Sequence, residues 1–340
     1  MLTRMHPQLA AFFSYRLEQQ VLLQQMEESG TVIPAPDIKG LRHWYRLFSQ
    51  RVGGAVLPVA EIRNLVADTD ERPIGLRLYR PLPAPPAPAS AALSPALIYF
   101  HGGGWTTGDL DTHDRLCRRI AIATQAIVIA VDYALAPELP WPQAPHDCIA
   151  TTRWVLRHAE SLGINPTQIG VAGDSAGGNL AAVVALALKT PDPTGDPALA
   201  CQILIYPATD LRSGFTPQYP SLHIHAERPP LSTAQMREHM CHYLGNRQDS
   251  AQHWQASPLL AASHQGAAPA LIMTAELDPL LDDGTAYARA LAVAGVEVMH
   301  RHYAGLTHGF IEMAGVLDSI VPNAISLMAD WFHTCSQSAH

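Results

Sequence analysis

Short apolar runs recur along most of the chain. They cover residues 96–100, 126–132, 201–206 and 270–274. Runs of this length without polar alternation predict strands that are buried on both faces of a sheet. Residues 74–79 instead alternate between apolar and other side chains, and this pattern predicts a half-buried strand.

Segments of helical character separate these strands. We predict helices over about residues 147–158, 179–189, 285–294 and 321–332, and a further strand over residues 296–303. Buried strands that alternate with helices are typical of a mostly parallel sheet covered by helices on both faces. The predicted fold class is therefore α/β.

Two regions depart from this alternation. Residues 7–28 and 41–50 place apolar side chains at three- and four-residue spacing, which predicts N-terminal helices. These helices can pack on the main domain, cover an active site as a mobile cap, or do both. Residues 208–257 contain several prolines and a capping box, Ser232-x-x-Gln235, that predicts the start of a helix.

A proline-rich stretch over residues 81–95 offers few ladder donors, and we expect it to link the two strands of a hairpin on the surface. It is too short to suggest a domain boundary. The expected division is an N-terminal helical cap segment over 1–55, a core over 56–207 and 258–340, and a cap insertion over 208–257.

The stretch Gly173-Asp174-Ser175-Ala176-Gly177 matches Gly-x-Ser-x-Gly and lies between a predicted strand and a predicted helix. In such a nucleophile elbow a sharp turn strains the serine backbone, and glycines flank it because side chains there would collide with the strand and the helix. The motif alone is weak, since small residues recur at many turns. Its position between strand and helix makes Ser175 the candidate nucleophile.

A second motif, His101-Gly102-Gly103-Gly104, follows the strand predicted over residues 96–100. Glycines let the backbone turn its amides toward a ligand. We expect the amides of Gly103 and Gly104, together with that of Ala176, to form an oxyanion hole. A flexible turn is the alternative, and the presence of the elbow favours the oxyanion hole. We expect His101 to anchor the loop through hydrogen bonds.

A serine hydroxyl needs a base to take its proton and an acid to orient that base. Asp278 lies just beyond one predicted strand and His308 just beyond the next, so the chain order is Ser, Asp, His. The rival acids are Glu276, Asp282 and Asp283, and the rival bases are His300 and His302, which lie inside a predicted strand.

The composition limits the kinds of partner that the protein can be expected to bind. The net charge is −8, from 22 basic and 30 acidic residues, and no basic stripe is present, so we expect no nucleic-acid partner. No apolar segment is long enough to span a bilayer, and the five cysteines show no paired spacing. We therefore expect a soluble, cytoplasmic protein without disulfides. Neither His223 with His225 nor His300 with His302 has a third ligand nearby, so no metal site is expected.

The motifs lie between Tyr99 and Phe310: His101–Gly104, Asp132-Tyr133, Leu135–Glu138, Gly173–Gly178, Tyr206-Pro207, Asp278–Leu280 and His308–Phe310. Together they resemble the microbial hormone-sensitive-lipase-like esterases, a family with the α/β-hydrolase fold and a helical cap. The first seventy or so residues match only in being helical. The resemblance implies a carboxylesterase for short acyl esters with catalytic Ser175, Asp278 and His308, and with no cofactor. It also implies that Asp174 and Glu138 support the site, and that the protein often forms a homodimer.

Two alternatives stay open at this point. An arylformamidase or other amidase could use the same triad, because its relatives carry a similar His-Gly-Gly-x-Trp and Trp105 fits that pattern. The gibberellin receptors are binding modules on this fold that lack the catalytic histidine. The presence of His308 argues against a receptor of that kind.

Overall fold

The computed structural model describes residues 5–13, 37–83, 93–189, 197–216, 218–245 and 247–338. In this part of the chain eight strands form one sheet, in the order β1-β2-β4-β3-β5-β6-β7-β8. The strands are β1 (Glu61–Asp68), β2 (Pro73–Arg80), β3 (Ser94–Phe100), β4 (Ile127–Asp132), β5 (Ile164–Asp174), β6 (Gln202–Ile205), β7 (Ala270–Leu277) and β8 (Val298–Thr307). The pairs β1–β2 and β2–β4 are antiparallel, and all other neighbours are parallel.

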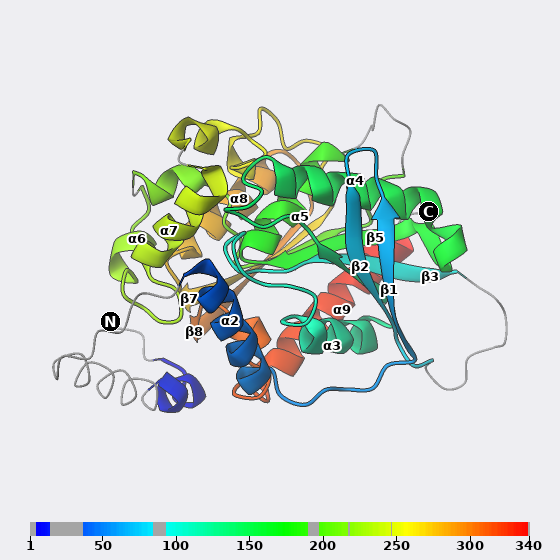
Figure 1. Cartoon of the computed structure of the whole chain (residues 1–340), viewed down its shortest axis with the longest axis horizontal. Coiled ribbons are helices and arrows are strands. Elements are labelled where there is room, and N and C mark those ends of the chain that lie inside the picture. The colour runs from blue at the N-terminus through cyan, green and yellow to red at the C-terminus, as the bar shows by residue number, and fades with distance from the viewer. Residues whose placement is uncertain are drawn as a thin grey trace.

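Helices cover both faces of this sheet (Figure 1). The helices α4 (Gln143–His158), α5 (Ala176–Ala187) and α8 (Leu281–Val293) pack on one face, and α3 (Asp114–Thr124) and α9 (Ile320–Ser338) pack on the other. Side chains of β3 alternate between the two cores: Ala96, Ile98 and Phe100 contribute to the first, and Leu97 and Tyr99 to the second. The predicted mostly parallel, two-sided sheet is confirmed.

Two elements of the fold were not predicted, and one prediction of local structure is wrong. The strand β1 was not predicted, because it is an edge strand whose side chains are mostly exposed and it lacks the apolar run of a buried strand. The helix α3 was not predicted either. The prediction of a hairpin across residues 81–95 is wrong, because β4 lies between β2 and β3 in the sheet; residues 84–92 of that link lie outside the described residues.

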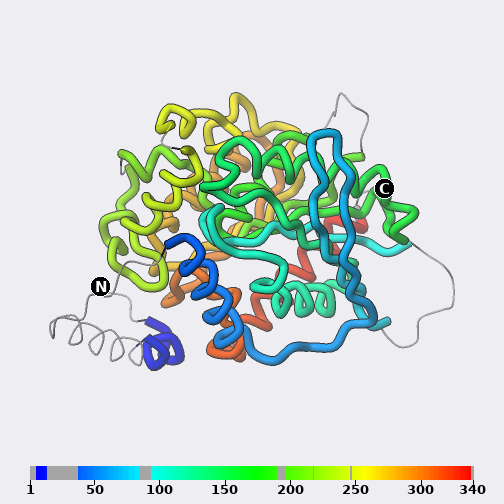
Figure 2. Tube along the Cα trace, viewed as in Figure 1, coloured from blue at the N-terminus to red at the C-terminus, as the bar shows by residue number. Residues whose placement is uncertain are grey.

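Two helical segments far apart in the sequence lie on one side of the molecule, as Figures 1 and 2 show. The helix predicted over residues 41–50 is α2 (Ile38–Val52), which Asp37 caps by accepting a bond of 2.7 Å from the amide of Gly40. The helix predicted from the capping box is α7 (Thr233–Leu244), which follows the short helix α6 (Ser221–Ile224). Both bonds of the Ser232–Gln235 capping box are present.

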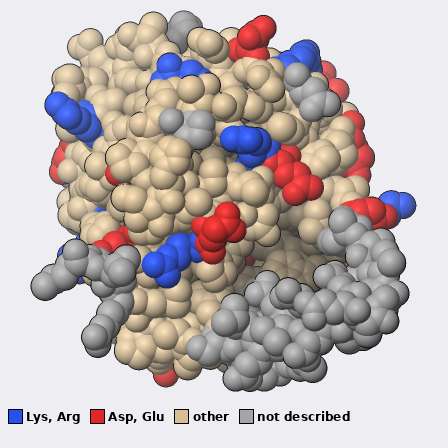
Figure 3. Space-filling model, turned by 90° about the vertical axis from the view of Figure 1, so that its left-hand side faces the viewer, with Lys and Arg blue, Asp and Glu red and all other residues tan. Residues whose placement is uncertain are grey.

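The N-terminal helix predicted over residues 7–28 is helical at residues 7–13, and its remainder lies outside the described residues. None of the described helices is both long and apolar enough to cross a membrane. On the face that Figure 3 shows, Lys and Arg side chains lie scattered among uncharged ones and form no basic stripe.

Candidate active site

Ser175 occupies the turn between β5 and α5, with φ 54° and ψ −117°. This left-handed conformation is strained for a residue with a side chain. The surroundings hold it in place, because the Ser175 amide donates to the carbonyl of Ile205 at 2.8 Å. A Cβ atom at Gly177 would lie 1.9 Å from the carbonyl oxygen of Phe100, so only glycine fits there. These close contacts explain the glycines of the predicted elbow.

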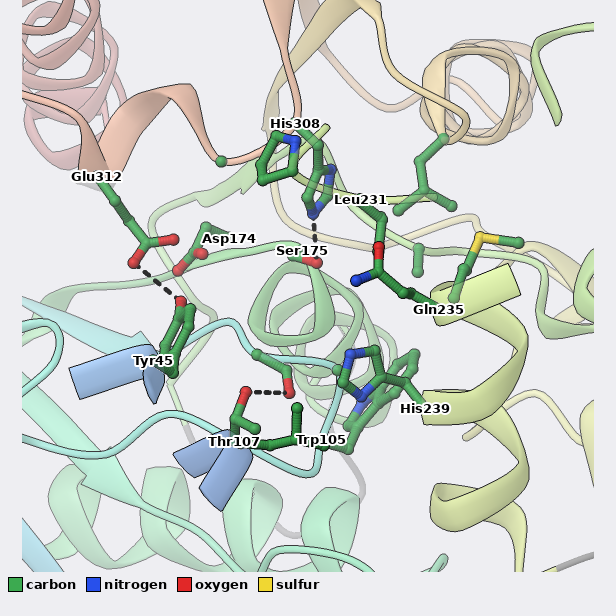
Figure 4. A pocket seen from close by; sticks show the side chains of 18 of the residues that line it. Tyr45, Trp105, Thr107, Asp174, Ser175, Leu231, Gln235, His239, His308 and Glu312 are labelled. Carbon is green, nitrogen blue, oxygen red and sulfur yellow. Dashed lines mark hydrogen bonds between the residues drawn. The ribbon is translucent and has the colours of Figure 1, made fainter. Parts of the chain in front are cut away.

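The structure brings the predicted serine, histidine and aspartate together. Ser175 Oγ lies 2.8 Å from His308 Nε2 (Figure 4). On the other side of the ring, His308 Nδ1 lies 2.7 Å from Asp278 Oδ2. Asp278 is fully buried, and its other oxygen accepts a bond of 2.9 Å from the amide of Leu280. Because β5, β7 and β8 run in parallel, the residues that follow their carboxyl ends meet at one edge of the sheet.

The electrostatics of His308 favour a charged imidazole. Burial alone would lower the pKa of His308, but the adjacent Asp278 carboxylate outweighs it and raises this pKa above the ordinary value. A hydroxyl, imidazole and carboxylate in this order can transfer the hydroxyl proton to the imidazole while the carboxylate stabilises the resulting cation.

The rival acids and bases bond elsewhere. Each rival acid accepts a hydrogen bond from a backbone amide: Glu276 from Gly305, Asp282 from Ser221 and Asp283 from Thr209. Both rival histidines, His300 and His302, have a ring nitrogen near Thr274 Oγ1. Of these four acidic residues, Asp278 is the one whose carboxylate lies within hydrogen-bond distance of His308.

The glycine-rich loop directly follows β3. Gly103 and Gly104 have φ values of 114° and 60°, and both line a pocket beside Ser175. Ala176 begins α5 immediately after Ser175. His101 stacks on Tyr133 with ring centroids 4.3 Å apart, and the Tyr133 hydroxyl donates to the His101 carbonyl at 2.7 Å. Burial lowers the pKa of His101 to about 4, so its ring is neutral near pH 7.

Asp174 joins the elbow to the glycine-rich loop. One oxygen of its carboxylate accepts from the amide of Gly102 at 3.0 Å and from the hydroxyl of Tyr99 at 2.7 Å, and it lies 3.3 Å from His113 Nε2. Burial would raise the pKa of Asp174, but His113 outweighs it and lowers this pKa. The carboxylate is therefore charged and fixes the loop relative to Ser175.

Behind Asp174 lies a buried cluster that sequence reasoning missed. Tyr45 of α2 donates to Glu312 at 2.9 Å (Figure 4). The carboxylate of Glu312 also lies 3.7 Å from His113 Nε2. Burial raises the pKa of Glu312 to about 7. Burial alone would lower the pKa of His113, but the nearby carboxylates of Asp174 and Glu312 outweigh it and raise this pKa to about 9. His113, Asp174 and Glu312 place possible metal-ligand atoms within 4.8 Å of one another. Their bonds to each other and to Tyr45 explain the cluster as an ion-pair network.

A pocket of about 160 Å³ opens over Ser175. Apolar side chains dominate its lining, among them Leu41, Trp44 and Phe48 of α2, Trp105, and Met236 and Met240 of α7. Figure 4 shows Tyr45, Asp174 and Glu312 on one side of Ser175 and Leu231, Gln235 and His239 on the other. A ligand held at Ser175 would therefore contact side chains on both sides of the serine.

Comparisons with known proteins identify the family of the chain. A family model described as an alpha/beta hydrolase fold matches residues 97–312. The chain is 40% identical over 265 residues to the esterase LipI of Mycobacterium tuberculosis, which covers 77% of this chain and 78% of LipI. It is 35% identical over 317 residues to the ethyl acetate hydrolase of Pseudomonas putida, which covers 92% of this chain and 94% of the relative.

A solved structure of similar fold is the hyperthermophilic esterase of the archaeon Pyrobaculum calidifontis, with a TM-score of 0.82 at 31% identity, over 99% of this chain and 100% of that one. These relatives are named as ester hydrolases, which contradicts the alternative of a non-catalytic receptor. The chain belongs to the hormone-sensitive-lipase-like carboxylesterases of the α/β-hydrolase superfamily and is a carboxylic ester hydrolase.

Proposed function

We propose that this chain hydrolyses esters of short acyl chains, with Ser175 as nucleophile, His308 as general base and acid, and Asp278 as the group that orients the imidazole. The observation that carries the proposal is the unbroken chain of bonds from Ser175 through His308 to Asp278, at 2.8 and 2.7 Å. This chain of bonds ends at the floor of an apolar pocket that can receive an acyl group.

The reaction proceeds in two halves. His308 Nε2 takes the proton of Ser175 as its oxygen attacks the ester carbonyl, and the proton then passes to the departing alcohol. Water repeats the attack on the acyl-enzyme, and His308 returns the proton to Ser175. The amides of Gly103, Gly104 and Ala176 donate to the oxyanion in both halves. His101 and Asp174 support the loop that carries two of these amides.

The cap in this proposal has two pieces. One belongs to segment 1–55, where α2 lies, and the other is the insertion over 208–257, with α6 and α7. The core is formed by 56–207 and 258–340. The proposal is supported by the pocket over Ser175, which side chains of α2 and α7 line together.

Two experiments test the proposed function. A fluorophosphonate probe should label the native protein in equimolar amount, and mass spectrometry should find the label on Ser175. The labelled enzyme should lose hydrolysis of p-nitrophenyl butyrate in proportion to labelling. Label on another residue, or full activity after complete labelling of Ser175, would contradict the assignment.

We expect the rate to depend sharply on acyl length. Each buried methylene contributes about 0.8 kcal/mol, so kcat/KM should rise from p-nitrophenyl acetate to butyrate or hexanoate. Because the cavity over Ser175 is small, about 160 Å³, we expect longer chains to extend beyond it. Palmitate should be hydrolysed at least about a hundredfold more slowly than butyrate. A series that peaks at palmitate would rule out a short-acyl pocket.

The pH profile should report His308. Only the neutral imidazole accepts the Ser175 proton, so kcat/KM should fall with a slope of one as pH drops through the pKa of His308. Because Asp278 raises this pKa, the midpoint should lie above the ordinary histidine value of about 6.5. Measuring kcat/KM for p-nitrophenyl butyrate between pH 5 and 9 would show it. A midpoint below 6 would contradict the assignment of His308.

A further inference from the structure

Within the oxyanion loop, residues 102–108, the carbonyl of Gly103 accepts hydrogen bonds that fix the shape of the loop. The Gly103 carbonyl accepts from the amide of Thr106 at 3.2 Å and from the amide and hydroxyl of Thr107, both at 2.9 Å. These bonds set the turn that gives Gly103 and Gly104 their positive φ values. They do not set where the turn lies relative to Ser175, which depends on contacts from outside the loop.

The first such contact comes from α2. Arg42 Nε donates to the carbonyl of Thr106 at 2.8 Å, and Arg42 Nη2 donates to the carbonyl of Ala136 at 3.0 Å. The same guanidinium makes two bonds of 2.7 Å to the carboxylate of Glu138. Glu138 is half exposed, so the ion pair itself contributes little stability. The pair with Glu138 instead orients the guanidinium of Arg42 toward the carbonyls of Thr106 and Ala136.

The second contact comes from α7. His239 Nδ1 shares a hydrogen bond of 2.6 Å with the hydroxyl of Thr106. The His239 ring also lies against Gly104, where a Cβ atom would stand 2.5 Å from its Cγ. Burial lowers the pKa of His239 to about 4, so the ring is uncharged near neutral pH. Thr106 is therefore held by its carbonyl from one cap helix and by its hydroxyl from the other.

We propose that Arg42 and His239 are positioning residues that act through Thr106 to aim the amides of Gly103 and Gly104 at the carbonyl oxygen of the bound ester. The proposal rests on the proposed function, in which those amides form the oxyanion hole. Arg42 and Thr106 do not line the pocket, whereas Leu41, Trp44 and Tyr45 of the same helix do. A loss of activity on changing Arg42 therefore arises from the position of the loop.

The test compares Arg42→Gln and His239→Phe with a matched control. Arg237→Gln is that control, because Arg237 lies on α7 and its Nε donates to a backbone carbonyl, that of Gly214, at the same 2.8 Å but far along the chain from the loop. Removing one oxyanion donor costs about 10²–10³ in kcat, so displacing the donors is expected to lower kcat about ten- to a hundredfold. KM should change less than about threefold, and the control should stay at the wild-type rate.

A pair of inhibitors separates the oxyanion hole from the pocket. An alkyl trifluoromethyl ketone adds Ser175 Oγ to its carbonyl and leaves an oxyanion, whereas the corresponding trifluoromethyl carbinol fills the same pocket without one. In Arg42→Gln the Ki of the ketone should rise in proportion to the loss of kcat/KM, and the Ki of the carbinol should stay constant. His239 itself lines the pocket, so His239→Phe should raise the Ki of the ketone by a clearly larger factor than the Ki of the carbinol. Equal weakening of both inhibitors would overturn the proposal, because it would reveal a damaged pocket.

Thr106→Val supplies an internal check. It keeps the Thr106 carbonyl and removes the hydroxyl, which contacts His239 and also donates to the Gly103 carbonyl at 3.4 Å. The loss should therefore be at least as large as in His239→Phe, and adding His239→Phe to Thr106→Val should lower the rate little further. Additive losses in the double variant would overturn the role of Thr106. If Arg42→Gln does not fold, Arg42→Lys retains the positive charge and lacks the fork, and it should show the same rise in the Ki of the ketone.

The outcomes also separate this proposal from the proposed function. A wild-type enzyme that forms no adduct with the ketone contradicts the role of Ser175 itself. A wild-type enzyme that binds the ketone tightly, together with variants that bind it equally well, contradicts only the positioning roles of Arg42 and His239.

Discussion

Replacing Ser175 with alanine is expected to lower kcat/KM for p-nitrophenyl butyrate by about 10⁶, because removal of a serine nucleophile in such a triad costs about that factor. The change deletes the atom that would attack the ester, and with it the 2.8 Å bond to His308. The backbone conformation at residue 175 is held by its neighbours and should persist. The rate is measured on protein expressed without any wild-type copy, and circular dichroism should show an unchanged melting temperature.

A matched serine provides the control for this experiment. Ser161 lies on the surface, and its hydroxyl donates to the carbonyl of His158 at 2.7 Å. Ser161→Ala should retain the wild-type rate. An activity of Ser175→Ala within tenfold of wild type would contradict the assignment of the nucleophile.

Replacing Asp278 with asparagine is expected to lower kcat by about 10⁴, the loss typical of this change in a triad. The new amide group would donate to His308 Nδ1, where the carboxylate now accepts. His308 would then carry its proton on Nε2, which could no longer accept the proton of Ser175. The amide oxygen would still accept from Leu280, so the fold should be retained. Steady-state kinetics and a thermal melt of the variant check both expectations.

Asp282→Asn is the control for Asp278→Asn, since Asp282 follows in the same segment but accepts from the amide of Ser221 instead. Its kcat should stay within a few-fold of wild type. If Asp282→Asn lost as much activity as Asp278→Asn, the effect would come from the segment and not from the acid that contacts His308.

Much of the core could be predicted because its signals are local. The strands β3, β4 and β7 are continuous apolar runs, since both of their faces are buried. Asp278 follows directly after the run of β7, and His308 follows the edge strand β8, so both lie at the same end of the parallel strands as Ser175. The edge strand β1 and the first turn of α5 were harder to predict. The strand β1 lacks an apolar run, and the glycines at 177 and 178 are unfavourable in helices, so the sequence does not indicate that α5 begins at Ala176.

The contacts around the site could not be predicted, because they join polar residues that are distant in sequence. On its own, Arg42 belongs to the pattern of a solvated helix face, and only the fold places it against Thr106 and Ala136. Glu312 and His113 likewise carry polar side chains of types that usually lie on the surface, yet both are buried beside Asp174. Burial of such groups is decided by tertiary packing, which a local pattern does not record.

The two contacts that hold Thr106, from Arg42 and from His239, have a consequence for the engineering of this enzyme. The family model matches residues 97–312. Arg42 lies before this region, whereas His239 lies within it. A chimaera that takes its N-terminal segment from a relative would import a new substrate entrance and also exchange one of two supports of the oxyanion loop. Grafted caps should therefore be transferred as pairs, with the residue at position 106 chosen to fit both.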